Sequence, residues 1–270
     1  MKPNLFFAAF TFAMLMICSS NAQGQATDVL ELIAKGEGAK AMEKAEELVK
    51  SSPENTEYII LRGKANLSLK NAEAAMEDFK KAESLKANST DLYLQLGIAH
   101  SLLGQEKESI QAFDKCIGAD AKNAEGFYNR GVAYFDFGNA DKAMSDLNKA
   151  IELNPNYAEA YLSRAELSYE AENFKFAIKD CNKAIELNPN LADAYYFRAI
   201  SRGGVEKDKE AIEDFNKCIE LNPNHDEALS FRGSAKYLSG NKKGACADWK
   251  KAMALGNEEA ENNYNSYCVE

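Results

Sequence analysis

The chain has 270 residues, 46% of them hydrophobic, which is enough to bury the core of one or two domains. Its 42 acidic and 32 basic side chains give a formal charge of −10. This excess of acid argues against a nucleic-acid ligand, because such binding depends on lysine and arginine contacts with phosphate, and against an anionic membrane surface. It favours a neutral or basic partner, although acidity also keeps a chain soluble.

Residues 1–22 differ in composition from the rest and are typical of a secretory signal peptide. Lys2 supplies the positive start, residues 5–17 form an apolar run, and small residues surround a candidate cleavage site after Ala22. The run is too short to span a membrane comfortably. We therefore expect an exported protein, periplasmic or secreted, with no transmembrane segment in the mature chain.

Cys18 leaves a second outcome open. The stretch Leu15-Met16-Ile17-Cys18 faintly resembles the lipobox of bacterial lipoproteins, in which the cysteine is acylated and becomes the first residue. Ile17 occupies a place that normally holds a small residue. Simple cleavage is therefore favoured over a lipid anchor at Cys18.

Residues 23–55 predict two short helices separated by a Gly-Glu-Gly turn. Ala41, Ala45 and Leu48 recur at helical spacing in the second helix, and Pro53 closes it. We interpret this segment as an N-terminal cap or degenerate repeat, because terminal repeats of an array are often atypical.

Residues 56–259 contain a repeat of 34 residues. Pro155, Pro189 and Pro223 recur at this interval, and each follows the sequence Ile-Glu-Leu-Asn. A fixed period of this size indicates an array of repeated structural units. We divide the array into six units: residues 56–89, 90–123, 124–157, 158–191, 192–225 and 226–259.

Each unit predicts two helices. In residues 124–157, apolar side chains recur at helical spacing in both halves, Gly138 separates the halves and Pro155 ends the second. Small residues recur where the two helices must approach closely: Gly131, Ala165, Ala199 and Gly233 in first helices, and Ala143, Ala177, Ala211 and Ala245 in second helices.

The joint occurrence of the period, the small residues and the closing proline resembles the tetratricopeptide repeat, in an exported bacterial type of protein. The resemblance covers residues 56–259 strongly and the preceding segment weakly. It implies an all-α fold: a right-handed superhelical solenoid of antiparallel helix pairs. Residues 260–270 predict a C-terminal capping helix.

No set of residues in the sequence points to catalysis or to metal binding. The two histidines, His100 and His225, lie in different units, and the common metal, nucleophile and phosphate-binding motifs do not occur. Cys116, Cys181 and Cys218 occupy packing positions, where buried inert thiols are expected. We therefore expect no enzymatic activity, no cofactor and no metal.

One arginine position in the first helix and one aspartate position in the second recur together through the units. The third unit lacks both and has Leu96 and Ala112 instead. Pairing within each unit leaves no charge stranded, so we expect structural ion pairs: Arg62–Asp78, Arg130–Asp146, Arg164–Asp180, Arg198–Asp214 and Arg232–Asp248. In the alternative interpretation the arginines bind an acidic ligand, but the matched aspartates would neutralise them.

In the family that the sequence resembles, first helices line a concave groove that binds peptides or helices. Carried onto this chain, the groove residues are Tyr128, Val132, Phe135, Asp136, Leu162, Glu166, Tyr169, Glu170, Tyr196 and Ile200, with Glu125, Glu159 and Asp193 at the rim. Aromatic side chains between acidic edges suit an extended apolar or basic segment. The alternative is that these side chains pack between adjacent repeats.

Cys246 and Cys268 predict a disulfide. Both lie eleven residues from Asn257, near which we expect the turn between the last repeat and the final helix. Residues equidistant from the turn of an antiparallel hairpin face each other, and export places the chain where disulfides form. The bridge would fasten the final helix over the last repeat, and the alternative is two unpaired thiols.

The resemblance implies a non-catalytic protein–protein interaction scaffold, expected to be a monomer, that binds a peptide or a helical segment of a partner outside the cytoplasm. The sequence does not identify that partner. Two alternatives stay open. One is a lipid-anchored assembly factor at a bacterial membrane, and the other is an enzyme or small-ligand binder with an unrecognised site in the groove.

Overall fold

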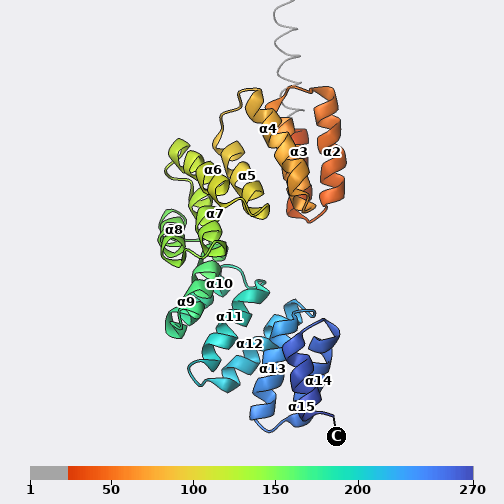
Figure 1. The fold of residues 1–270 in the computed structure, drawn as a ribbon, viewed down its shortest axis with the longest axis vertical. Helices are drawn as coiled ribbons and strands as arrows, with labels where there is room; N and C mark the ends of the chain where they lie inside the picture. The colour runs from red at the N-terminus through yellow and green to blue at the C-terminus, as the bar shows by residue number, and fades with distance from the viewer. Residues whose placement is uncertain (1–23, 270) are drawn as a thin grey trace, which may run out of the picture. The chain divides into compact units, whose positions relative to one another are not determined.

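The structure is a computed structural model that describes residues 24–269; the predicted signal peptide lies outside the described residues. Every regular element between residues 24 and 269 is a helix (Figure 1). The elements are a first helix described over residues 24–34, followed by α2 (Gly38–Ser51), α3 (Thr56–Ser68), α4 (Ala72–Ser84), α5 (Thr90–Leu102), α6 (Glu106–Ala119), α7 (Ala124–Asp136), α8 (Ala140–Leu153), α9 (Ala158–Glu170), α10 (Phe174–Leu187), α11 (Ala192–Gly203), α12 (Asp208–Leu221), α13 (Asp226–Leu238), α14 (Lys242–Ala254) and α15 (Glu258–Tyr267).

The helices follow the 34-residue period of the sequence. The first helix of each predicted repeat begins at the first residue of that repeat: Thr56, Thr90, Ala124, Ala158, Ala192 and Asp226. Within a repeat the two helices pack on each other, as α9 does on α10 and α11 on α12, and α10 packs in turn on α11. The all-α fold of stacked helix pairs is therefore confirmed.

The chain divides into two compact units between Ala133 and Tyr134, within α7. The core of the first unit contains Val29 of the first helix together with Ile59 and Phe79, all of them fully buried. The segment before the first full repeat is thus part of this core. Gly63 allows the packing, because a Cβ atom there would lie 2.3 Å from Cε1 of Phe79.

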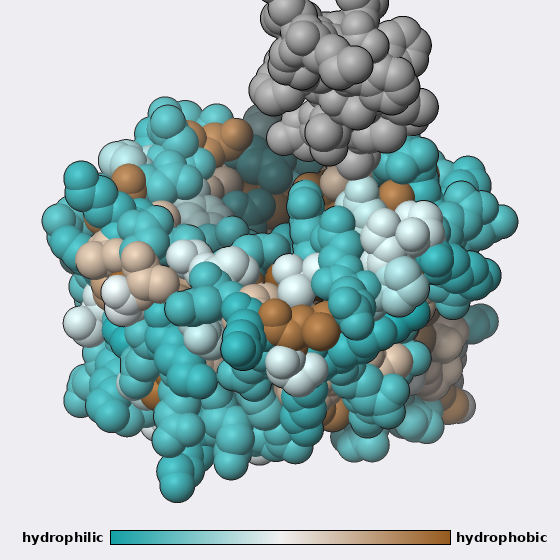
Figure 2. All heavy atoms as spheres, turned by 90° about the horizontal axis from the view of Figure 1, so that it is seen from above, coloured by the Kyte–Doolittle hydropathy of each residue, from teal (hydrophilic) through white to brown (hydrophobic). Residues whose placement is uncertain are grey.

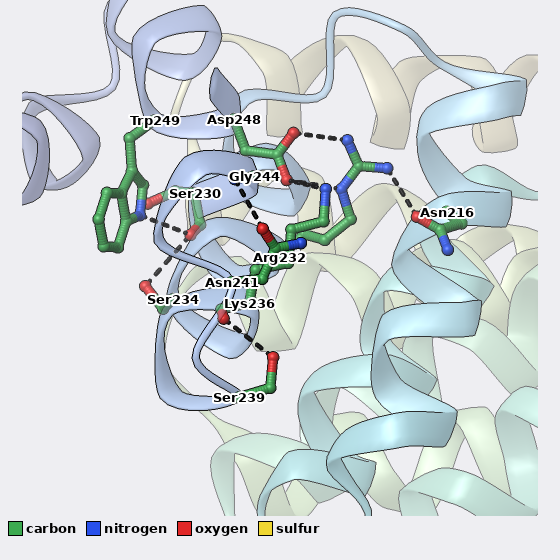
Figure 3. Close-up of polar contacts among 10 residues, drawn as sticks. All are labelled: Asn216, Ser230, Arg232, Ser234, Lys236, Ser239, Asn241, Gly244, Asp248 and Trp249. Carbon is green, nitrogen blue, oxygen red and sulfur yellow. Dashed lines mark hydrogen bonds and ion pairs between the residues drawn. The ribbon is translucent and has the colours of Figure 1, made fainter. Parts of the chain in front are cut away.

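In the core of the second unit, too, a glycine on one helix packs against a large ring on the next helix. A Cβ atom on Gly233 would lie 2.6 Å from Nε1 of Trp249, which is fully buried. The indole N–H donates to the carbonyl oxygen of Ser230 at 3.1 Å, so the ring packs without leaving its donor unsatisfied (Figure 3).

The fifteenth residue of each repeat has a positive φ angle and ends the turn between the two helices. Glycine holds this place in three repeats, and Lys70 (φ 60°), Glu172 (φ 57°) and Glu206 (φ 61°) hold it in the others. A left-handed residue at this point is the usual way to end a helix, and glycine adopts it with the least strain. In the repeat that contains Gly203 and Gly204, the left-handed residue is therefore Glu206.

The last helix, α15, packs on α14, and Figure 1 shows α13, α14 and α15 side by side. The structure joins Cys246 to Cys268, whose Cα atoms are 5.7 Å apart. The ring of Tyr267 lies 4.7 Å from that of Tyr237 and 5.9 Å from that of Trp249. No helix of the described part is both long enough and apolar enough to cross a membrane.

Candidate partner-binding surface

One face of α9 carries three of the predicted groove residues on successive turns. Leu162, Glu166 and Tyr169 recur at spacings of four and three residues, which places them on one side of the helix. All three side chains are half-buried, and Glu170 beside them is exposed. This face therefore offers apolar and acidic groups together.

The predicted groove residues of α7 are divided between the two units. Tyr128 and Val132 belong to the first unit and are half-buried there. Phe135, half-buried, and Asp136, exposed, belong to the second. The surface described below is the part within the second unit, on α9, α11 and α13.

Tyr196 packs between repeats. Its ring centroid lies 4.7 Å from that of His225 and 6.2 Å from that of Phe231, which both belong to the region at the start of α13. Burial raises the pKa of its hydroxyl. Ile200 on the same helix is buried in the core of the second unit, with 8% of its surface exposed. Both residues therefore pack against their neighbours, and a role for them in a binding groove stays a prediction.

Asp193, predicted at the groove rim, lies against His225. The distance between Oδ1 of Asp193 and Nε2 of His225 is 3.5 Å. Burial alone would lower the pKa of His225, but hydrogen bonds with Asp193 and Cys218 raise it. The same hydrogen bond lowers the pKa of Asp193, so the charged forms of both groups support each other.

Glu166 is the centre of an acidic region. Burial, together with repulsion from Glu170, Asp136 and Asp193, raises the pKa of its carboxyl to about 7. Loss of hydration next to its neighbours also raises the pKa of Asp136. A positive group placed beside Glu166 would relieve this repulsion.

A cavity of about 270 Å³ opens next to this region. Residues of α9, α11, α12 and α13 line it: Tyr169, Ala199, Ile200, Gly203, Asp208, Ala211, Phe215, Phe231, Ser234, Ala235 and Leu238. Asp208 is the only charged residue among them. In the first unit a second cavity, of about 320 Å³, is more polar, and the ion pair of Lys64 with Asp91 (2.7 Å) lies at its wall.

The repeated arginines form a ladder that the sequence predicted only in part. Arg232 donates to both carboxylate oxygens of Asp248, at 2.7 and 2.8 Å, and its remaining Nη1 donates to Oδ1 of Asn216 at 2.7 Å (Figure 3). Asn216 belongs to the second helix of the preceding repeat. The arginine thus connects two repeats as well as the two helices of its own.

The pairing of an arginine with the aspartate of its own repeat recurs in other repeats, and in two of them with the asparagine of the preceding repeat. Arg164 contacts Asp180 and Asn148, Arg198 contacts Asp214 and Asn182, and Arg62 contacts Asp78. Arg130 donates to Asp114 of the preceding repeat at 2.6 Å, and its pairing with Asp146 stays a prediction, since the two residues belong to different units. The pattern of charged residues does not reveal these asparagines, but Asn148, Asn182 and Asn216 recur every 34 residues, which is the signal that the sequence offers.

Two further cations reinforce the aspartates. Arg202 donates to Asp214 at 2.6 Å, and Lys236 donates to Asp248 at 2.8 Å. Because each of these aspartates receives two cations, the arginines are engaged in structure. This arrangement disfavours the alternative in which they bind an acidic ligand.

His225, Asp226 and Glu227 offer ligand atoms within 4.8 Å of one another. These groups already have protein partners, because Asp226 accepts a hydrogen bond from Asn257 at 3.0 Å and His225 contacts Asp193. We therefore do not assign a metal site to them.

Sequence profiles of the tetratricopeptide repeat match residues 56–89, 90–123, 124–157, 158–191 and 192–225. These intervals begin and end where the proline period places the first five repeats. No curated protein matches the chain closely enough in sequence to count as a relative.

Solved structures with the same fold include three that cover the chain to different extents. The Cut9–Hcn1 assembly of the APC/C superposes with a TM-score of 0.82 at 15% identity over 97% of this chain, which spans about half (52%) of that chain. A tetratricopeptide repeat protein from Parabacteroides merdae gives 0.63 at 19% identity over 93% of this chain and 100% of its own. MamA gives 0.54 at 28% identity over 64% of this chain and 98% of its own.

Proposed function

Since this chain belongs to the tetratricopeptide-repeat family, we propose that it is a non-catalytic scaffold that binds a segment of a partner protein on the first-helix face of α9, α11 and α13. Repeat arrays of this kind use extended faces for protein–protein interaction. The observation that carries the proposal is the face of α9, where Leu162, Glu166 and Tyr169 remain partly open to solvent.

The charge of this face indicates the kind of partner. Burial and the neighbouring carboxylates raise the pKa of Glu166 to about 7, and no cation is among the groups that shift it. A lysine or arginine of the partner would supply a counter-charge. Much of the described surface in Figure 2 is hydrophilic, with only small hydrophobic areas in that view, as expected for a soluble array that binds through a limited face.

We further propose that the protein acts outside the cytoplasm, after cleavage behind Ala22. The support is the pattern of residues 1–22 and the adjacent pair Cys246–Cys268, which an oxidising compartment would keep bonded. Acylation at Cys18 would instead hold the same scaffold at a membrane surface.

The binding face can be tested by site-specific photo-crosslinking in the native host. A photo-reactive residue replaces Leu162 on α9 in one variant and Glu213, exposed on α12, in the control. We expect a defined crosslinked partner from position 162 and none from position 213. Equal crosslinking from both positions, or none from position 162, would contradict the proposal.

A further inference from the structure

The apolar cavity of the second unit lies where one repeat lacks a side chain. The twelfth residue of the repeat is aromatic in three repeats, as Phe135, Tyr169 and Tyr237, but it is Gly203 in α11. A Cβ atom built on Gly203 would meet no atom within 4 Å. The position is therefore open, and the neighbouring rings stand around an unfilled space.

The walls of this space are apolar and firmly held. Phe215 is 3% exposed, and its ring stacks on that of Phe231 with the centroids 6.4 Å apart. Tyr169 is supported by Phe197 at 6.2 Å. Because the walls are anchored in the core of the second unit, the cavity is preformed and needs no rearrangement to accept a guest.

The size of the cavity favours a single side chain as the guest. Its volume of about 270 Å³ is below the roughly 300–1,000 Å³ typical of sites for whole small molecules. Leu238, at the end of α13 and on the cavity wall, is 82% exposed. A guest side chain would cover this leucine and remove further apolar surface from water.

The charges around the cavity indicate which residues of the partner would lie on either side of the guest side chain. Asp208 is on the wall, and Glu166 and Glu170 are on the same helix as Tyr169. The nearby cations Arg202 and Lys236 are paired with Asp214 and Asp248. Among the residues that line the cavity, the charge is therefore the negative one of Asp208, which is complementary to lysine and arginine.

We propose that this cavity binds one large apolar side chain of a partner protein, aromatic or long aliphatic, in a segment where lysine or arginine flanks it. The inference rests on the proposed function and adds to it the anchor residue, its pocket and the charge of the segment. The anchor enters beside Gly203, and the flanking cations lie against the carboxylates of α9 and Asp208.

The test uses the full-length protein and fluorescein-labelled nine-residue probe peptides, read by fluorescence anisotropy. The first probe has a central tryptophan between two pairs of lysines, with glycine elsewhere. The second replaces tryptophan by alanine, and the third replaces the lysines by glutamates. We expect the first to bind at least about tenfold more tightly than either of the others, as for a buried aromatic hot spot.

A variant that fills the cavity provides the matched control on the protein. Gly203→Phe places a ring in the open space, and Gly118→Phe makes the same change on α6, where a Cβ atom also meets nothing within 4 Å. Gly203→Phe should weaken binding of the first probe about tenfold or more and leave the melting temperature unlowered. Gly118→Phe should leave binding unchanged.

Each other outcome overturns the inference. These are equal binding of the first two probes, equal binding of the lysine and glutamate probes, unchanged binding by Gly203→Phe, or no binding of the first probe up to millimolar concentration. The photo-crosslink from position 162 distinguishes a failure of the anchor pocket from a failure of the proposed scaffold function. If Gly203→Phe keeps that crosslink at full yield, the anchor pocket is wrong and the scaffold function stands; if position 162 never crosslinks, the function itself fails.

Discussion

Glu172 adopts a left-handed backbone conformation at a repeat position that three other repeats fill with glycine. It has a φ angle of 57° at the place where Gly138 has 80° in the preceding repeat. A side chain with a Cβ atom is strained in this region, and glycine is not. The fold accepts the strain because the turn is set by the helices on both sides, through the hydrogen bond from the N–H of Asn173 to the carbonyl oxygen of Ser168 (2.8 Å).

We therefore expect Glu172→Gly to raise the free energy of unfolding by about 0.5–1 kcal/mol, since the relief of strain exceeds the added entropy of the unfolded chain. Urea denaturation measures the change. Glu213→Gly, inside α12, is the control and should lower the same quantity by about 1 kcal/mol. A loss of stability in Glu172→Gly would show that the left-handed turn is not strained.

Glu166 should make stability depend on pH. Its pKa in the folded protein is about 7, above the ordinary value of 4.5, because burial and neighbouring carboxylates disfavour its charge. The group therefore favours the folded state most below pH 4.5, and this contribution is lost as the pH rises through 7. Glu166→Gln should become more stable relative to the wild type over that interval.

The measurement is a series of urea denaturation curves between pH 4.5 and 8 for the wild type and Glu166→Gln. The same change at Glu213, exposed on α12, is the control and should show no such trend. A difference between Glu166→Gln and the wild type that stays constant with pH would contradict the role given to burial.

At the scale of helices, the arginine ladder is the main polar connection between repeats. The carboxylate of Asp180 is almost fully buried, with 2% of its side chain exposed, and Arg164 reaches it with two N–H donors while a third reaches Asn148. A buried charge that loses its partner remains desolvated, so removing one member costs more than removing both.

We expect Arg164→Leu to lower the free energy of unfolding by about 3 kcal/mol and the double variant Arg164→Leu/Asp180→Leu to lower it by clearly less. A double-mutant cycle by chemical denaturation measures the coupling. The exposed pair Lys183–Glu186 on the same α10 is the control, and its coupling should be below about 0.5 kcal/mol. If the changes in the free energy of unfolding at positions 164 and 180 are additive, the two residues are not coupled and the ladder does not stabilise the fold.

The ladder is interrupted in the third repeat. Leu96 and Ala112 replace the arginine and the aspartate there, and Lys80 stands where later repeats have the asparagine acceptor. A lysine could not accept a hydrogen bond from an arginine. The arginine, the aspartate and the asparagine of the ladder are thus all replaced here. Leu96 packs instead in the core of the first unit.

The attachment of α15 is a second property at this scale. This helix is mostly polar and fully buries only Ala260, so its contact with the last repeat depends on Ala260, on the rings of Tyr264 and Tyr267, and on the link between Cys246 and Cys268. Closing this loop should contribute about 3 kcal/mol in the chain-entropy description. The disulfide stays a prediction of the exported protein.

Peptide mapping of the exported protein without reductant should recover residues 246 and 268 in one linked peptide. Reduction should then lower the melting temperature of the wild type and leave the variant Cys246→Ser/Cys268→Ser unaffected. The buried thiols Cys116, Cys181 and Cys218 serve as internal controls, because they should be alkylated only after unfolding. Alkylation of Cys246 and Cys268 in the folded, unreduced protein would refute the link.

For the whole molecule, the property that matters most to function is the compartment to which the chain is delivered. The proposal of export predicts a mature N-terminus at Gln23, as the small residues before it favour cleavage there. Intact-mass measurement of the protein from its host should give the mass of residues 23–270. A mass that matches an acylated chain beginning at Cys18 would instead establish the lipid-anchored form.

Much of the fold follows from the sequence because the repeat is local. The spacing of Pro155, Pro189 and Pro223 sets the length of each unit, and the helical recurrence inside a unit depends only on neighbouring turns of the same helices. Arginine and aspartate of one repeat are always 16 residues apart, and the short turn between their helices brings them together. These features needed no knowledge of distant contacts.

The candidate site was less predictable, because it depends on how one repeat packs on the next. Whether Tyr196 faces solvent is decided by Phe231 of the following repeat and by His225 at the end of its own repeat, whose rings lie beside that of Tyr196. The cavity at Gly203 likewise exists only because α9, α12 and α13 bring rings around an empty position. The sequence alone determined the family, the helix pairs and the charge partners within each repeat, while the tertiary structure decided which side chains remain open to a partner, since burial is a property of neighbours far apart in the chain.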